Sequence, residues 1–257
     1  MFKRHLAVLA AAAAFVTTVG AAPAFAAEGA SGPGEAFNYD CEYLGITVGR
    51  AQISVGGRTD VSGEKVLPLV VFAKTDPMFV LFPIKDKYVS WWNPEKKLSL
   101  GTDLNADEGR KRRKERHRFD RANGKATVTR DREGQPREEV VYDTDVNAQD
   151  ILAAFFTLRE RQLNVGDVEE LPVFTGKRTF MMRAQVDKKE TIKVPAGTFE
   201  TKSIRVSVQF SGKLESKRDI VINVTDDGRN MPVRISADLL LGSVEARLTS
   251  FEKGAGR

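Results

Sequence analysis

The sequence predicts a mainly β protein in which a curved antiparallel sheet or open barrel wraps around one buried α-helix. Most segments alternate apolar and polar residues with a period of two, as half-buried antiparallel strands do. One segment, Gln149 to Leu163, shows no such alternation and has a helix-forming composition. Turn residues also separate the strand segments at even intervals, which favours a barrel or sandwich over βαβ units.

Most of the chain is predicted to form strands. The clearest is Ser203 to Phe210, whose apolar residues would line one face while its polar residues line the other. Asn123-Gly124 lies between two strand-like segments and predicts a tight hairpin, and Asp227-Gly228 repeats this signal. Further strands are predicted at Phe37 to Tyr43, Arg50 to Val55, Lys65 to Ala73, Lys87 to Trp92, Ile220 to Val224 and Val244 to Leu248.

The exception to the alternation is Gln149 to Leu163, which is rich in Ala, Leu, Phe, Arg, Glu and Gln. We expect Asn147 to cap this helix, with Asp150 three residues later in a capping-box arrangement. Apolar side chains cover more than half of its circumference, so the helix should be buried rather than lie on a surface. These apolar residues are Ile151, Leu152, Phe155, Phe156 and Leu158.

The first residues have the layout of a cleaved secretory signal. Lys3 and Arg4 precede the apolar run Leu6 to Val19, and Ala24-Phe25-Ala26 supplies a cleavage site. The run is shorter than the about 20 apolar residues that span a bilayer. We therefore expect a periplasmic protein without a transmembrane segment, cleaved near Ala26/Ala27. The expected organisation is a signal peptide (1–26), a flexible leader (27–35), a single β-rich domain (36–252) and a C-terminal tail (253–257).

Charge and cysteine content narrow the class of protein. Lys3 and Arg4 are two of the 40 basic residues, so the mature chain has 38 basic and 35 acidic residues, a net charge of +3. A nucleic-acid-binding domain usually carries a far stronger basic excess, so no nucleic-acid partner is expected. The single cysteine, Cys41, cannot form an internal disulfide, so core burial must stabilise the fold. We interpret Cys41 as a small buried strand residue; a reactive or dimerising thiol is the alternative.

Several segments that follow one another along the chain carry a family resemblance. They are Phe37 to Asp40 with Tyr43 to Ala51, Asp150 to Arg159, Val194 to Glu200, Thr225 to Arg229 with Pro232 to Ile235, and Gly242 to Ala246. In this order the set resembles domain-of-unknown-function family 3108, which consists of exported bacterial proteins. The resemblance covers nearly all of the mature chain and implies a periplasmic, β-rich protein without an established activity or assigned catalytic residues. The architecture is also similar, more distantly, to open-barrel lipoprotein-localisation factors.

The sequence offers no catalytic constellation, metal site or cofactor motif. His117 is the one histidine after the signal, and zinc sites need three or four convergent ligands. Asp226 and Asp227 precede a glycine and are better explained as turn residues than as a carboxylate pair. Asp150 and Glu200 are candidate general bases, although Asp150 is better explained as the hydrogen-bonding partner of its own helix N-terminus. We therefore predict no catalytic residue, no metal and no cofactor.

A run of basic residues is the sharpest local feature. If the run is a strand, its cations at two-residue spacing all point to one side and repel each other. They then need acids opposite them or an anionic partner, such as phosphate-bearing lipopolysaccharide or phospholipid headgroups. Neutralisation by a paired strand is the favoured interpretation, with nearby acids at Asp131, Glu133, Glu138 and Glu139. This cationic stripe consists of Arg110, Arg112, Lys114, Arg116 and Arg118.

A second candidate is the segment Pro77 to Ile84, which is apolar throughout and bounded by prolines. It either plugs the core or lines the mouth of a cavity for an acyl chain, and core plugging is favoured. The side chains that would line such a mouth are Met78, Phe79, Leu81 and Phe82. The neighbouring Trp91 and Trp92 should place one ring on each face of a strand.

These features favour a non-enzymatic periplasmic protein that binds an envelope component, such as a lipid or lipopolysaccharide, or an envelope-assembly partner. One alternative is a hydrolase that acts on envelope polymers through acidic residues, which would need two acids close together in a concave pocket. The other is a scaffold that binds protein, which would have a filled interior and an apolar patch outside.

Overall fold

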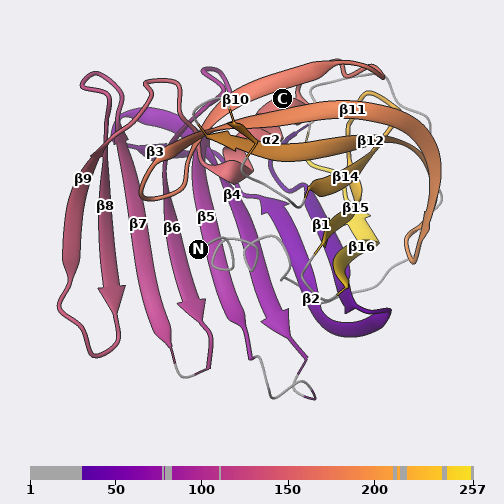
Figure 1. Ribbon diagram of the computed structural model, residues 1–257, viewed down its shortest axis with the longest axis horizontal. Coiled ribbons are helices and arrows are strands. Elements are labelled where there is room, and N and C mark those ends of the chain that lie inside the picture. The colour runs from indigo at the N-terminus through magenta and orange to yellow at the C-terminus, as the bar shows by residue number, and fades with distance from the viewer. Residues whose placement is uncertain are drawn as a thin grey trace.

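The computed structural model describes residues 31–76, 78, 83–109, 111–210, 213–214, 219–238 and 242–255. The predicted signal peptide lies outside the described residues, as do Phe79, Leu81, Phe82 and Arg110. The fold class is confirmed: a large antiparallel sheet curves around one helix without closing into a complete barrel (Figure 1).

The strand segments predicted before the helix are present, and β3, β6 and β9 are additional strands that were not predicted. They are β1 (Ala36–Tyr43), β2 (Ile46–Val55), β3 (Thr59–Val61), β4 (Glu64–Thr75), β5 (Lys85–Asn93), β6 (Leu98–Asp107), β7 (Arg112–Asp120), β8 (Lys125–Arg132) and β9 (Glu138–Asp143). The remaining elements are the helix α2 (Ile151–Arg159) and the strands β10 (Val168–Phe174), β11 (Thr179–Val194), β12 (Gly197–Phe210), β13 (Lys213–Leu214), β14 (Ile220–Thr225), β15 (Pro232–Asp238) and β16 (Ser243–Glu252). Both predicted hairpin turns are confirmed, since Asn123-Gly124 joins β7 to β8 and Asp227-Gly228 joins β14 to β15.

The sheet is continuous because its last strand pairs with its first. The strand order is β10-β11-β12-β14-β15-β16-β1-β2-β4-β5-β6-β7-β8-β9, with β3 on β4 and β13 on β12. The edge strands β9 and β10 flank α2 in sequence, and the chain between β9 and α2 crosses to β10. There the backbone N–H of Gln149 donates to the carbonyl of Pro172 (2.9 Å), and the N–H of Phe174 donates to the carbonyl of Gln149 (2.8 Å). Connecting chain rather than strand pairing therefore bridges the open side.

The helix is shorter than the sequence suggested, and its cap is Asp150 rather than Asn147. The Asp150 carboxylate accepts hydrogen bonds from the backbone N–H groups of Leu152 (3.0 Å) and Ala153 (3.1 Å). Gln149 cannot belong to the helix because its backbone is already engaged with β10. The second Asp150 oxygen accepts from the Ser90 hydroxyl (2.7 Å), which fixes the start of α2 against β5. At the other end, the chain leaves the helix after Arg159 through a turn at Glu160.

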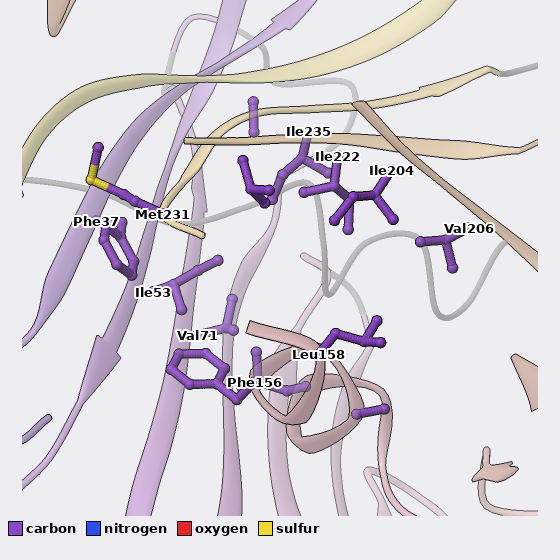
Figure 2. Close-up of a cluster of buried hydrophobic side chains, with 14 of the residues drawn as sticks. Phe37, Ile53, Val71, Phe156, Leu158, Ile204, Val206, Ile222, Met231 and Ile235 are labelled. Atoms are coloured by element: carbon purple, nitrogen blue, oxygen red, sulfur yellow. The ribbon is translucent and has the colours of Figure 1, made fainter. Parts of the chain in front are cut away.

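The largest hydrophobic cluster lies between α2 and the inner face of the sheet. Phe156 and Leu158 are buried on the helix, and Phe156 packs against Trp92 of β5 with 6.0 Å between ring centroids. Figure 2 shows Ile204, Ile222 and Ile235 in a row across from Leu158. A second, smaller cluster joins β7, β8 and β9 to Phe174 of β10; it consists of Ala126, Val128, Ala148 and Phe174 with Phe119 and Tyr142 against it.

A buried ion pair that the sequence did not reveal fixes the C-terminal end of α2. Arg159, 1% exposed, donates two hydrogen bonds of 2.8 Å to the Glu35 carboxylate and one of 3.1 Å to the carbonyl of Asn230. Its guanidinium also lies over the rings of Phe37 (5.0 Å) and Phe156 (4.9 Å). Bidentate and stacked contacts of this kind suit arginine rather than lysine.

The alternation in β12 holds for its apolar face and only in part for its polar face. Ile204 and Val206 are buried as predicted, and Arg205 is exposed, but Ser203 is 3% exposed. Ser203 lies beside Asn223 of β14, whose side chain donates to Glu190 (2.9 Å) and accepts from Arg234 (3.1 Å). Long side chains from neighbouring strands thus cover this part of the outer surface.

Candidate functional site

A small cavity lies beside α2 in the interior of the sheet. Its volume is about 40 Å³. The helix contributes one wall, and eight strands contribute the rest; we call these strands, β1, β2, β4, β11, β12, β14, β15 and β16, the half-barrel. The lining residues are Tyr39, Ala51, Ile53, Val71, Ile151, Leu152, Phe155, Leu158, Met182, Val206, Ile220, Ile222, Ile235 and Ala246.

Local structure explains why these side chains meet. Alternation along each strand turns Ile53, Val71 and Ala246 inward, and the cap at Asp150 sets the start of the helix opposite them. Ile151 and Phe155 lie one turn apart on α2 and are half-buried, whereas Leu152 and Leu158 are buried. The cavity is therefore bordered on one side by two apolar side chains that reach towards solvent.

The cavity offers an apolar ligand no polar contact. Tyr39 is its one lining residue with a polar side-chain group, and the Tyr39 hydroxyl donates to the carbonyl of Pro232 (3.0 Å). Burial raises the pKa of Tyr39 well above its ordinary value of 10.0, despite the opposing charge of Arg159, so the phenol stays neutral. A wholly apolar lining can select a hydrocarbon and cannot orient a polar substrate.

The cationic stripe lies on the opposite face of the sheet. Arg112, Lys114 and Arg116 are exposed along β7, while the intervening His117 packs edge-to-face on Phe174 inside the molecule (5.7 Å). Arg118 shares the outer face, and Arg110 lies outside the described residues. The stripe and the apolar cavity therefore cannot hold the head and tail of one small ligand.

The acids that neutralise the stripe come from β6 and not from the four acids named from the sequence. Asp103 accepts from Arg116 (2.7 Å) and Arg118 (2.9 Å), and Asp107 accepts from Arg112 (3.3 Å). Partial burial raises the pKa of Asp103. Hydrogen bonds from Arg116, Trp91 and Arg118 to the carboxylate outweigh this effect and hold the pKa below its ordinary value. A signal for this pairing was present, since acids at positions 103 and 107 alternate in the strand before the stripe.

Within the apolar segment Pro77 to Ile84, the structure describes Met78, Pro83 and Ile84. Met78 is 85% exposed, and its backbone N–H donates to the Asp76 carboxylate (3.0 Å). Met78 therefore neither plugs the core nor lines the cavity, because a local turn directs it outward. Phe79, Leu81 and Phe82 lie outside the described residues. Trp91 and Trp92 do lie on opposite faces, with Trp92 fully buried.

The proposed general bases are engaged in structural contacts. Asp150 caps α2, as described above, and Glu200 accepts from the Thr191 hydroxyl across the β11–β12 hairpin (2.7 Å). Asp226 and Asp227 lie at the β14–β15 turn, as predicted. Asp227 accepts from the Thr225 hydroxyl (2.7 Å) and Asp226 pairs with lysines, so neither is a free carboxylate.

A buried polar cluster on the inner face of β7 and β8 was missed from the sequence. The His117 ring and Glu115 carboxylate lie 2.9 Å apart, and Arg130 lies 3.6 Å from the same carboxylate. Burial raises the pKa of Glu115, but the His117 hydrogen bond and the positive charge of Arg130 outweigh it and keep that pKa below its usual value. Arg130 also donates to the carbonyl of Gly176, whose φ of +84° and close approach to His117 leave no room for a Cβ. Through the Arg130 bond the cluster fastens the β10–β11 turn, while the buried Nδ1 atom of His117 has no hydrogen-bond partner among the described residues.

Within the described residues, no group of three or more His, Cys, Asp or Glu side chains is arranged to hold a metal ion. The described helix is also too short to cross a bilayer, and the described part of the chain contains no other candidate span.

The geometry defines a β-barrel-like protein: an open antiparallel sheet wrapped around a helix, with an apolar interior. Residues 38–249 match the family model described as "Protein of unknown function (DUF3108)", so the chain belongs to this family, as the sequence motifs predicted. No curated protein matches the chain in a sequence search.

Three solved structures are similar to the chain, and the first of them shows the same kind of fold. A β-barrel-like protein of domain of unknown function DUF1849 from Brucella abortus is similar with a TM-score of 0.56 and 9% identity, over 86% of this chain and 97% of that chain. A putative lipoprotein from Parabacteroides distasonis has a TM-score of 0.33 and 10% identity, over 89% of this chain and 100% of that chain. A putative exported protein with a YmcC-like fold from Bacteroides fragilis has a TM-score of 0.32 and 12% identity, over 86% and 96%. At these identities the likeness concerns the fold alone, and the last two scores support no inference.

Proposed function

We propose that this is a non-enzymatic periplasmic protein that binds an apolar chain, such as the acyl chain of an envelope lipid, between α2 and the half-barrel. The observation that carries the proposal is the cavity beside Phe155, whose lining has no polar group left to satisfy. The secretory layout of Lys3 to Ala26 supports delivery to a compartment where such lipids are abundant.

The size of the cavity defines how a chain would enter. At about 40 Å³ it is far smaller than the roughly 150 Å³ apolar cavity that binds benzene in a model protein. A longer chain therefore requires Ile151 and Phe155 to rotate away from the interior. Both are half-buried, so their displacement gives up less apolar contact than moving a core residue would.

The energetics favour occupation by hydrocarbon. An unfilled apolar cavity of about 40 Å³ costs about 1 kcal/mol, at roughly 24 cal/mol per Å³. Each methylene transferred from water adds about 0.8 kcal/mol. Several buried methylenes therefore outweigh the rearrangement of two side chains on α2.

Neither alternative class gains comparable support. A hydrolase needs acids poised to exchange protons, whereas Asp103 is held by Arg116, Arg118 and Trp91. A protein-binding scaffold was expected to have a filled interior, whereas a cavity lies beside Phe155. The cavity supports a small apolar ligand in preference to both.

The test is binding of a fluorescent long-chain fatty-acid analogue to the mature protein, with palmitate as competitor. Ala246→Val, on the cavity wall, should weaken binding about ten-fold or more, because the added methyl groups occupy the space of the chain. Ala122→Val, in the exposed β7–β8 turn, is the matched control and should bind as the wild type does. Circular dichroism would check that both variants fold.

Organic extracts of protein purified from the periplasm should contain lipid, identified by mass spectrometry. The proposal is wrong if delipidated wild-type protein does not bind the analogue, or if Ala246→Val and Ala122→Val bind it equally well.

A further inference from the structure

We propose that the outer face of β5 to β8 carries a second site, which binds a phosphate-bearing group in a hollow around Lys114. The hollow has a volume of about 330 Å³ and is separate from the apolar cavity, since the sheet lies between them. Its basic lining residues are Lys87, Lys114, Arg116 and Arg137, and its acidic ones are Asp103, Glu115 and Asp131; Val89, Leu104, Asn105 and Thr129 complete it. The Glu115 carboxylate is turned to the inner face, where it pairs with His117, so it does not count toward the charge of the hollow.

Strand register brings the cations together from segments far apart in the sequence. Lys87 of β5 pairs with Asn105 of β6, which pairs with Lys114 of β7. These three side chains form one row across the outer face, with an amide between two ammonium groups. Directly opposite residues have Cβ atoms about 5 Å apart, so one small ligand can touch all three.

Lys114 differs from the other described cations of the stripe because it is not paired with a carboxylate. Arg112 is paired with Asp107, and Arg116 and Arg118 share Asp103. Lys114 lies between these pairs and, among the described residues, has no carboxylate within 4.0 Å, although Asp131 is its cross-strand neighbour. The middle of the stripe is thus the part that its own acids leave unneutralised.

The hollow as a whole has an excess of positive charge. Arg116 offsets Asp103, and the remaining cations are Lys87, Lys114 and Arg137 against Asp131. Arg137 lies 3.9 Å from Glu139, and both side chains are mostly exposed. An exposed ion pair of this kind has a small interaction energy, so Arg137 remains available to an anionic ligand. The excess of about two charges matches a phosphate monoester, which carries about −1.5 to −2 at neutral pH.

The arrangement of donors also favours phosphate over a carboxylate. Lys87 and Lys114 reach the hollow from two strands, Arg137 reaches it from the connection between β8 and β9, and the Asn105 amide supplies a neutral donor. A phosphate group has three free oxygen atoms that can accept from several directions, whereas a carboxylate has two in one plane. The ligand is therefore either a soluble phosphate or the headgroup of an anionic lipid at a membrane surface.

The experiment measures two probes on the mature protein. Inorganic phosphate is titrated by calorimetry, and binding to phosphatidylcholine vesicles with and without phosphatidic acid is measured by sedimentation. Lys87→Gln/Lys114→Gln should weaken binding about ten-fold or more, since two charge-assisted contacts are lost. The control Lys65→Gln/Lys177→Gln removes the same charge from exposed lysines outside the hollow and should have little effect.

Binding of both probes would identify the phosphate group itself as the ligand, and binding of the phosphatidic-acid vesicles alone would identify a lipid headgroup. Asp131→Asn should tighten binding, because it removes an acid that repels the ligand. An unchanged affinity would contradict the claim that the net positive charge of the hollow attracts the ligand. The inference is overturned if the wild type binds neither probe, or if the two double variants lose affinity equally. Fatty-acid binding by the same variants should be unaffected, which separates this result from the proposed function.

Discussion

The two sides of the sheet share one alternating pattern but enclose different interiors. In the half-barrel, Tyr39, Ile53 and Val71 face α2 and surround an apolar cavity. We define the flank as β5 to β9. The inner face of its strands β7 and β8 presents Glu115, His117 and Arg130. Glu115 contacts both His117 and Arg130, and Arg130 also donates to the carbonyl of Gly176. In Figure 1 the flank is the broad array of strands at the left, and β5 joins it to β4 of the half-barrel.

The length of α2 limits how much of the inner face it covers, and within the flank the helix lies against β5 and β6. A helix of 9 residues is about 14 Å long, and neighbouring strands are about 4.8 Å apart, so α2 covers roughly three strands. Beyond β6 the interior must be closed by other groups, namely Phe174 of β10 and the turn at Gly176. The charges of Glu115 and Arg130 can be buried there because each lies against a protein partner.

The largest expected effect concerns the anchor of α2 in the half-barrel. Arg159→Leu would leave Glu35, 8% exposed, as a buried carboxylate without its cation, and should lower the free energy of unfolding by about 3–5 kcal/mol. Urea unfolding followed by circular dichroism would measure this. In Glu35→Leu/Arg159→Leu the unpaired charge is absent, so the loss should be much smaller. Equal losses in the two variants would show that the ion pair is not the cause.

A second variant tests whether the flank is a separate cooperative unit. Phe174→Ala removes ring contacts with His117 (5.7 Å), Phe119 (5.9 Å) and Tyr142 (6.1 Å), and should cost about 3 kcal/mol. Hydrogen exchange should accelerate in β7 to β9 and stay slow in β1 and β2. Equal acceleration in both regions would mean that the half-barrel and the flank open together. Phe174→Leu, which keeps most of the volume, should show a smaller change.

The smallest expected effect is a pH dependence of the flank. Asp86 of β5 is 2% exposed, and burial together with the charge of Glu108 raises its pKa from 3.8 to about 6. The folded state therefore holds this proton more tightly than the unfolded state. The resulting stabilisation is complete below about pH 4 and is lost as the pH rises through about 6.

Asp86→Asn cannot ionise, so the wild type should lose about 1–3 kcal/mol relative to it between about pH 4 and pH 7.5, at about 1.4 kcal/mol per pKa unit. Urea unfolding of both proteins at the two pH values would measure the difference. Asp131→Asn, at an exposed acid of β8, is the control and should show little pH-dependent change against the wild type. A constant difference between Asp86→Asn and the wild type would exclude Asp86 as the titrating group.

Local sequence signals were reliable where the determining contacts are local. The turn at Asn123-Gly124 and the buried face of Gln149 to Leu163 depend on neighbouring residues, and both were predicted. The helix α2 starts later in the sequence than predicted, because the backbone of Gln149 bonds to β10, a segment more than twenty residues away. The acids of the cationic stripe were sought on the following strand, whereas Asp103 and Asp107 lie on the preceding one. Alternation reports which face a side chain occupies and does not report which neighbouring strand neutralises it.

By itself the sequence determined the β-rich class, the apolar character of the helix α2, the hairpin turns and the family, because each depends on periodicity, turn chemistry or ordered short motifs. The pairing of β16 with β1, the buried contact between Glu35 and Arg159, the cavity beside Phe155 and the separation of the cationic stripe from that cavity were decided only by the tertiary structure. All four join residues that are distant along the chain or lie on opposite faces of one sheet. Their energies arise when the sheet curves and brings those residues together, and no local pattern records that curvature.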